Sequence, residues 1–250
     1  MRATPQSPLH RLGLELKRLV KILVLAVFLL ELCFLSKIVL MRWVDPESTS
    51  FERSEMARLA SQARPMTWSE HWVPYDKISV HLKRAVIISE DDLFARHDGV
   101  QWGAIERAWQ KNQSQLEHAQ KSAASLPLHL VGGSTITQQL AKNLLLSGER
   151  DLIRKGQELL ITLALECVLS KKRILEIYLN HVEWGEGVFG AQAASLHYFK
   201  KPASQLTASE AARLAVMLPR PKYFEKLPNS PYLQNRAEQI SARASQAVLP

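Results

Sequence analysis

Twelve residues, GGSTITQQLAKN at 132–143, combine two glycines with hydroxyl, amide and amine side chains. A helix that begins after glycines presents free N–H groups and the positive end of its dipole, which suits phosphate. Amides one turn apart suit sugar hydroxyls and acetamido groups, and a lysine pairs with phosphate as a point charge. The density of amides favours a helix start that faces a ligand over a polar cap on a surface helix. The spacing is not that of a P-loop, because G-x-x-x-x-G-K is absent.

Three consecutive acids, Glu90, Asp91 and Asp92, follow the apolar stretch AVII in ISEDDLFARHDG. A carboxylate beside apolar neighbours is poorly solvated in its charged form, so its pKa rises, as suits a general base. The triplet alone also fits an acidic helix end that turns into solvent, which is the commoner case. The sequence therefore leaves both interpretations of the triplet open.

A third group of charged residues stands in RDLIRKGQE. Arg154 and Glu158 are four residues apart and share a helix face, Lys155 lies beside them, and Arg150 comes one turn earlier. The group is either an anion-binding cradle with one acid in it or a surface salt bridge, which is common and weak. Taken alone, the salt bridge is the better-supported interpretation.

Composition points to an anionic partner. The chain has 250 residues, a formal charge of +8, a pI near 9.6 and 46% hydrophobic residues. That charge suits nucleic acid, anionic lipid or a phosphorylated substrate. The two cysteines, Cys33 and Cys167, stand in unrelated contexts, so no disulfide is expected and cysteine usage does not indicate a compartment.

The apolar run at 19–41 predicts a single transmembrane helix, because about 20 apolar residues cross a membrane. Glu31 and Lys37 interrupt it and leave its depth and tilt undefined. A cleaved signal peptide is rejected, because the run ends in LMRWVDP without a small-residue cleavage site. The positive-inside bias predicts a cytoplasmic N-terminus, with the bulk of the chain outside. The basic residues before the run are Arg2, Arg11, Lys17, Arg18 and Lys21, against Arg42, Arg53 and Arg58 after it.

The remaining pattern is mainly helical. Helices are predicted over 78–89, 102–109, 152–169 and 171–179, with others that begin at Thr135 and Thr207 in T-x-x-Q and T-x-x-E capping boxes. Pro219 ends the last of these, a short hairpin is expected around 184–190, and residues 110–131 are expected to form a mobile surface segment or lid. The predicted buried stripe of the 152–169 helix is Leu152, Leu159, Leu160, Leu163, Cys167 and Val168.

Five motifs together carry a specific resemblance: SEDDLFARHDG, GGSTITQQLAKN, RKGQE, ILEIYLN and GVFGAQAASLHYF. In this order and spacing the sequence resembles the biosynthetic peptidoglycan glycosyltransferases, glycosyltransferase family 51, over residues 70–225. The resemblance implies a mainly α fold: a lysozyme-like, two-lobed domain preceded by a single transmembrane helix. The tail after 225 leaves no room for a transpeptidase domain, so the monofunctional proteobacterial type is expected. The expected division is 1–18 cytoplasmic, 19–41 transmembrane, 42–69 juxtamembrane, 70–225 glycosyltransferase and 226–250 a C-terminal helix or tail.

The resemblance implies a reaction and its residues. In this family, the 4-hydroxyl of lipid II attacks the anomeric carbon of a growing strand held on undecaprenyl pyrophosphate, with inversion and release of the lipid pyrophosphate. Glu90 matches the catalytic base and Glu158 the second essential acid. Residues expected to bind substrate are Asp91, Phe94, His97, Ser134, Thr135, Gln138, Gln139, Lys142, Asn143, Arg150, Arg154 and Lys155.

The resemblance implies no obligatory cofactor, although Mg or Mn can accompany the substrate pyrophosphate in some members; the sequence shows no dedicated metal-ligand set. The implied partners are lipid II, the lipid-linked strand, the bilayer, cell-division or elongation proteins, and the inhibitor moenomycin, but no nucleic acid. The implied location is the inner membrane, with a periplasmic catalytic domain.

Two other functions stay under consideration. A lytic enzyme of the same architecture needs paired acids but no basic cluster, and a non-catalytic membrane adaptor needs a basic face but no acids within it. The segment between Arg107 and Gly132 is longer than the family pattern leads us to expect, so substrate handling there can differ.

Overall fold

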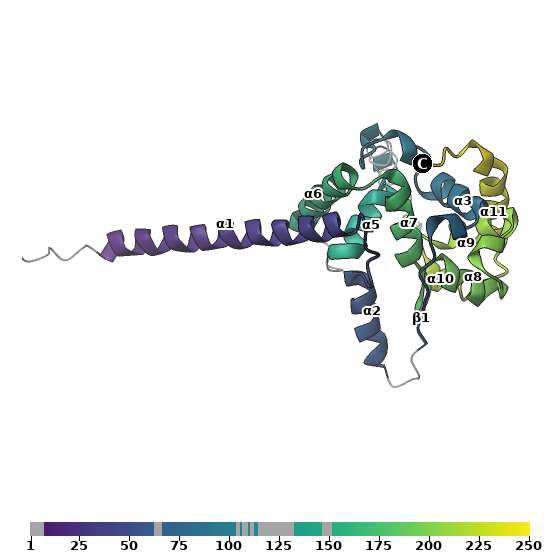
Figure 1. The fold of residues 1–250 in the computed structure, drawn as a ribbon, viewed down its shortest axis with the longest axis horizontal. Coiled ribbons are helices and arrows are strands. Elements are labelled where there is room, and N and C mark those ends of the chain that lie inside the picture. Colours follow the sequence, from purple (N-terminus) through teal and green to yellow (C-terminus); the bar gives the residue numbers. More distant parts are fainter. Residues whose placement is uncertain are drawn as a thin grey trace, which may run out of the picture.

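The computed structural model describes residues 8–62, 67–103, 106, 110, 113–114, 133–146 and 152–250 (Figure 1). These residues form a mainly α fold, as predicted. Arg150 and most of the expected helix at 102–109 and of the expected lid at 110–131 lie outside them.

The described helices run from the long N-terminal α1 to α11 near the C-terminus. They are α1 (Pro8–Leu40), α2 (Ser50–Ala60), α3 (Val80–Glu90), α5 (Ile136–Leu145), α6 (Leu152–Val168), α7 (Lys171–His181), α8 (Ala191–Phe199), α9 (Ala208–Met217), α10 (Pro221–Phe224) and α11 (Pro231–Arg243). Four 3-10 turns join them: η1 (Tyr75–Lys77), η2 (Phe94–Arg96), η3 (Ala203–Gln205) and η4 (Ala244–Gln246).

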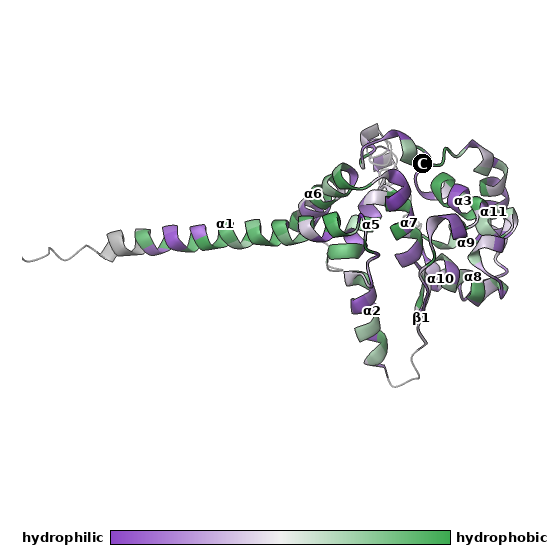
Figure 2. Cartoon of the chain, in the orientation of Figure 1, coloured by the Kyte–Doolittle hydropathy of each residue, from purple (hydrophilic) through white to green (hydrophobic). Residues whose placement is uncertain are grey.

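Helix α1 projects from the rest of the molecule as a long rod, with hydrophilic turns near its start and mostly apolar turns further along (Figure 2). Its Gly13–Leu40 segment is apolar and long enough to cross a membrane. These 28 residues span about 42 Å as helix, more than the roughly 30 Å of a hydrocarbon core. This confirms the prediction of one apolar membrane-anchoring helix before the globular part.

The last turns of α1 belong to the globular part as well as to the anchor. Ile38 is fully buried and Met41 is 9% exposed. Arg173 on α7 donates hydrogen bonds to the backbone oxygens of Met41 (2.8 Å) and Val44 (3.0 Å) and pairs with Asp45 at 2.7 Å. A guanidinium at a helix C-terminus satisfies free carbonyls and complements the helix dipole. The anchor is therefore fastened to α7 rather than joined by a loose linker.

The helices pack in two groups. In the first, α3 packs against α9 and α11, and α9 also packs against α11; in the second, α5 packs against α6, α7 and α2. The second half of α3 is buried on all sides, because four consecutive residues, Ala85, Val86, Ile87 and Ile88, are each at most 8% exposed. Residues 226–250, expected as a helix or tail, contribute α11 to the first group through buried Leu233 and Ile240.

Capping boxes set three helix starts. Thr135 and Gln138 form the predicted box before α5, and Thr207 and Glu210 form the predicted box before α9. A third box, Thr49 with Glu52, begins α2. In each box the threonine side chain accepts from the N3 backbone and the N3 side chain accepts from the threonine backbone, so two orphan N–H groups are satisfied. Helix α9 ends at Met217, shortly before Pro219.

The predicted hairpin is present. Strands β2 (Glu183–Gly185) and β3 (Val188–Phe189) are antiparallel, and β1 (Ser69–Glu70) adds a parallel third strand beside β3. Gly187 has a φ of +72°, and a Cβ there would lie 2.1 Å from the backbone oxygen of Thr67. Both its conformation and the close approach of the chain before β1 require glycine at this turn.

The predicted buried stripe of α6 is wrong for three of its members, whereas Leu159 and Val168 are half-buried. Leu160, Leu163 and Cys167 are exposed, whereas Ile161 and Leu165 are buried. The helix carries apolar residues on both sides, so hydrophobic periodicity could not choose the inner face. The outer apolar face belongs to a helix that packs against α1, the membrane anchor.

Candidate active site

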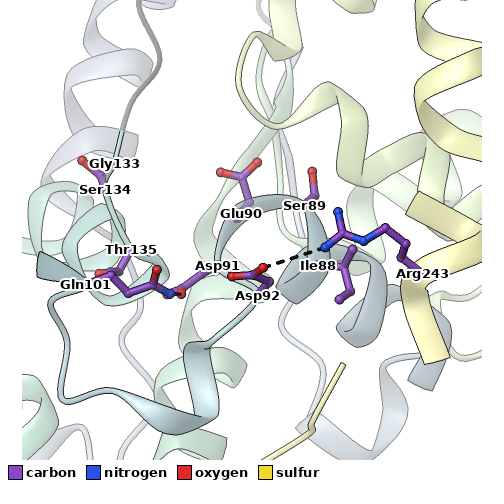
Figure 3. A pocket seen from close by; sticks show the side chains of 10 residues that line it. All are labelled: Ile88, Ser89, Glu90, Asp91, Asp92, Gln101, Gly133, Ser134, Thr135 and Arg243. Carbon is purple, nitrogen blue, oxygen red and sulfur yellow. Dashed lines mark hydrogen bonds and ion pairs between the residues drawn. The ribbon is translucent and has the colours of Figure 1, made fainter. Parts of the chain in front are cut away.

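A cavity of about 220 Å³ opens where the two helix groups meet (Figure 3). Its walls come from the end of α3, residue 101, the residues before α5 and the end of α11. It gathers four of the predicted site residues: Glu90, Asp91, Ser134 and Thr135. The lining residues are Ile88, Ser89, Glu90, Asp91, Asp92, Gln101, Gly133, Ser134, Thr135 and Arg243.

Glu90 is the last residue of α3 and stands half-buried at this cavity. Its Oε2 accepts a hydrogen bond of 2.8 Å from Nε2 of Gln139 on α5. Burial raises the pKa of the Glu90 carboxyl above its ordinary value; the Gln139 hydrogen bond opposes this rise, and the charge of Asp91 adds to it. A carboxylate of raised pKa that faces a polar cavity has the properties of a general base.

Asp91 ties the end of α3 to the start of α5. It is 4% exposed and accepts from Ile136 N (3.0 Å), Gln101 Nε2 (2.6 Å) and His97 Nε2 (2.9 and 3.0 Å). Nδ1 of His97 accepts from Gly99 N at 3.0 Å, so the network places the imidazole proton on Nε2, facing Asp91. Asp91 and His97 therefore position Glu90 and the α5 N-terminus relative to one another.

Thr135 and two further predicted substrate-binding residues, Gln138 and Phe94, form the frame of the site. The Thr135 hydroxyl donates to the backbone oxygen of Gly99 at 2.6 Å while it caps α5. Gln138, 4% exposed, completes that capping box. Phe94 is fully buried, with Nζ of Lys171 4.6 Å from its ring centroid. These buried side chains support the walls of the cavity.

The outward face of the α5 region holds the remaining members of its motif. Ser134 and Lys142 are exposed, and Gln139 and Asn143 are half-buried. These four side chains are accessible to solvent, unlike the buried members of the same motif. Their predicted role in binding sugar and phosphate groups stays a prediction.

Glu158 forms a separate cluster on α6. It is 3% exposed, and its Oε2 lies 3.1 Å from Nη1 of Arg154 while its Oε1 pairs with Nζ of Lys155. The two cations compensate the buried Glu158 carboxylate, and the three side chains together carry one net positive charge. Glu158 does not line the Glu90 cavity, although α6 packs against α5.

Three further residues complete the site without a predicted role. Gln101 donates to Asp91, and Nη2 of Arg243 on α11 lies 3.8 Å from Oδ2 of Asp92 (Figure 3). The Tyr178 hydroxyl on α7 donates to Oε1 of Gln139 at 3.0 Å. Tyr178 lies within the ILEIYLN motif, which gives a signal for it; Arg243 belongs to no motif, and no local pattern relates it to Asp92.

Within the described ranges, one carboxylate–imidazole group has ligand atoms close enough together for a metal ion: Glu52, Glu70 and His181, within 4.8 Å of one another. It lies outside the Glu90 cavity. His181 Nδ1 is 2.8 Å from Oε1 of Glu52, and Glu52 Oε2 accepts from Thr49 N at 2.6 Å. These contacts explain the group as hydrogen-bonded side chains that fasten α2 to α7.

Comparison with known proteins identifies the family of the chain. A family model described as "Transglycosylase" matches residues 56–245, from α2 to η4. The biosynthetic peptidoglycan transglycosylase of Paraburkholderia xenovorans is 51% identical over 218 residues, which cover 87% of this chain and 86% of the relative. The proteins of the same name from Bordetella avium (49% over 227 residues; 90% and 92% covered) and Burkholderia thailandensis (52% over 221 residues; 88% and 82% covered) are equally similar. The chain therefore belongs to the transglycosylase family.

Proposed function

We propose that this transglycosylase is a peptidoglycan glycosyltransferase that polymerises lipid II into β-1,4 glycan strands during cell wall biosynthesis. The names of its relatives support peptidoglycan as the product. The observation that carries the proposal is the half-buried carboxyl of Glu90, of raised pKa, at the mouth of a polar cavity beside the α5 N-terminus.

Glu90 is the proposed base. The acceptor 4-oxygen forms a bond to the donor anomeric carbon as the bond from that carbon to the pyrophosphate oxygen breaks. The hydroxyl proton passes to Glu90, and the bonding electron pair leaves with undecaprenyl pyrophosphate. Attack on the face opposite the leaving group inverts the anomeric configuration. The raised pKa suits Glu90 to hold this proton, while Gln139 keeps the carboxylate oriented.

The basic residues of α5 and α6 are the proposed pyrophosphate site. Lys142 is exposed on α5, and the Arg154–Lys155–Glu158 cluster retains a net positive charge on the neighbouring helix. Negative charge grows on the pyrophosphate as its bond to the sugar breaks, and fixed cations stabilise it most where water is partly excluded. Glu158 serves here as the acid that orders Arg154 and Lys155. A divalent cation, Mg or Mn, would enter with the pyrophosphate and screen the same charge.

The membrane has a place in the proposal. Helix α1 anchors the enzyme in the inner membrane, with the basic N-terminal residues in the cytoplasm and the catalytic domain in the periplasm. The exposed apolar side chains Ile153, Leu160 and Leu163 of α6 lie on a helix that packs against α1. We expect this face to rest in the bilayer surface, which would bring the lipid-linked pyrophosphate to α6. Proteins of cell division or elongation and the inhibitor moenomycin are the further proposed partners.

The experiment that tests this function is product analysis with the full-length protein in detergent micelles and fluorescent lipid II. The expected product is a long glycan that lysozyme digests, whose formation moenomycin blocks. Cleavage of preformed glycan without polymerisation would instead identify a lytic enzyme. Binding to anionic lipid with neither product would identify an adaptor, and either result would contradict the proposal.

A further inference from the structure

A chain of two hydrogen bonds runs from the core to Glu90. The Tyr178 hydroxyl donates to Oε1 of Gln139 at 3.0 Å, and Nε2 of the same amide donates to Oε2 of Glu90 at 2.8 Å. Tyr178 is 1% exposed and does not line the cavity, so it does not touch a substrate there. A phenylalanine would fill the same apolar space, whereas a buried hydroxyl is costly unless it is hydrogen-bonded. The hydroxyl therefore has a role besides packing.

That role follows from the two unlike ends of the Gln139 amide. One end is a carbonyl that only accepts, and the other is an NH₂ that only donates. An ionised Glu90 only accepts, so it needs the NH₂ end. A reversed amide would set Oε1 against the carboxylate and would leave the Tyr178 proton without its acceptor. In the observed orientation both hydrogen bonds are made at once.

We propose that Tyr178 is a positioning residue that holds the Gln139 amide with its NH₂ end toward Glu90, and so keeps this side chain ready to accept a proton from the acceptor hydroxyl. The inference rests on the proposed role of Glu90 as base. Once Glu90 has taken the proton, its carboxyl can donate to Gln139 only if the amide reverses. Tyr178 opposes that reversal and so favours return of Glu90 to the ionised form.

The charged groups around the Tyr178–Gln139–Glu90 hydrogen bonds, called the relay below, support the positioning role of Tyr178. Burial, with the charges of Glu90 and Asp91, raises the pKa of Tyr178, so its hydroxyl keeps the proton that it donates. Asp91 is held by His97 and Gln101, and Asp92 lies near Arg243. On the neighbouring helix α6, the carboxylates are paired: Glu158 with Arg154 and Lys155, and Glu166 with Lys171 of α7.

The test is the pH profile of kcat/KM for lipid II polymerisation by the full-length protein and its Tyr178→Phe variant. The Gln139 hydrogen bond lowers the pKa of Glu90, so a freely reversing amide should raise it. The acid limb should move up by about one pH unit, a roughly tenfold loss of kcat/KM on that limb, with recovery toward wild type at higher pH.

Tyr198→Phe is the matched control, because the Tyr198 hydroxyl also donates to an internal acceptor, the backbone oxygen of Trp184, at 2.9 Å. Its profile should keep the wild-type acid limb. On a Gln139→Leu background, which removes the middle of the relay, Tyr178→Phe should cause no further shift.

Two results would overturn the positioning role of Tyr178 while leaving Glu90 as base. One is an acid limb in Tyr178→Phe that does not differ from wild type. The other is an equal shift of the acid limb when Tyr178→Phe is added to Gln139→Leu. The Glu90→Gln variant tests the proposed function separately. If this variant still polymerises lipid II with the wild-type acid limb, that limb does not come from Glu90. The roles of Glu90 as base and of Tyr178 as positioning residue would then both be wrong. Thermal melting of each variant identifies any profile change that comes from unfolding.

Discussion

At the scale of single residues, the candidate site contains one carboxylate that faces the cavity, the proposed base, and a second that holds the surrounding elements in place. Glu90 faces the cavity, whereas Asp91 is buried and accepts from a backbone N–H and two side chains. Adjacent acids thus have different roles because the chain turns between them: Glu90 ends α3 and Asp91 is its C-cap.

Asp91→Asn should destabilise the protein, because an NH₂ would replace one acceptor oxygen within a ring of donors. A buried donor left without a partner costs about 1–3 kcal/mol. Chemical denaturation of the two proteins in detergent measures the difference in the free energy of unfolding. Asp92→Asn, an exposed neighbour with one pair at 3.8 Å, is the control and should change stability by less than about 0.5 kcal/mol. Equal stability of Asp91→Asn and wild type would contradict the positioning role.

The apolar residues before Glu90 made a raised pKa of its carboxyl one of two open interpretations, and burial at the end of α3 favours it over a solvated helix end. The partners of Asp91 could not be predicted, because Ile136 is 45 residues away and only the fold brings it close. Tyr178 and Arg243 were missed for the same reason: their contacts cross between helices, and local periodicity carries no information about them.

At the scale of elements, local signals predicted helix starts well and helix faces less well. The boxes at Thr135 and Thr207 need only residues three apart, so they are legible in the sequence. Helix α6 has apolar side chains on opposite faces, and which face is buried depends on α5 and α7, which the periodicity of one helix does not reveal. The residues of α6 that were wrongly predicted to be buried form an exposed apolar face on a helix that packs against the anchor.

A probe on Cys167 should report contact of that face with lipid. With Cys33 replaced by serine, Cys167 is the single cysteine left and is exposed on α6. A fluorophore there should be quenched by brominated lipid in proteoliposomes, because apolar side chains favour burial in the bilayer over water. The control is the same probe at Ser204→Cys, with both native cysteines replaced, at an exposed residue in η3. Quenching by aqueous iodide alone at both positions would contradict membrane contact of α6.

At the scale of the whole molecule, the membrane-proximal part and the catalytic part form one unit. Arg173 fastens the end of α1 to α7, and His181 pairs with Glu52 of α2. Beside them Lys222 of α10 lies 2.5 Å from Glu55 of α2 and 3.1 Å from Glu183 of β2. These contacts join the anchor to α7, which carries Tyr178, and join α2 to the hairpin.

This charged interface should make stability depend on pH. Burial raises the pKa of Glu183 to about 7 from 4.5, while Lys222 opposes the rise. The folded state then holds a proton that the unfolded state releases, so this contribution is complete below pH 4.5 and is lost as pH rises through about 7. The 2.5-unit difference bounds the loss at about 3 kcal/mol. Glu183→Gln should flatten the fall of melting temperature between pH 5 and 7, and Glu238→Gln, at an exposed residue of α11, should not. An unchanged slope in Glu183→Gln would contradict the assignment.

The most direct test of the central claim is polymerisation of lipid II by the full-length protein and by Glu90→Gln, side by side. Glutamine keeps the size of the side chain and a carbonyl that can face the cavity, but it cannot take a proton near neutral pH. Glu238→Gln serves as the matched control, because it removes an exposed carboxylate from α11 outside the cavity. Wild type and Glu238→Gln should both make glycan. Folded Glu90→Gln should polymerise lipid II at least about a hundredfold more slowly, because proton transfer contributes about 10²–10⁴-fold to the rate. Equal polymerisation by Glu90→Gln and wild type would contradict the role of Glu90 as the base.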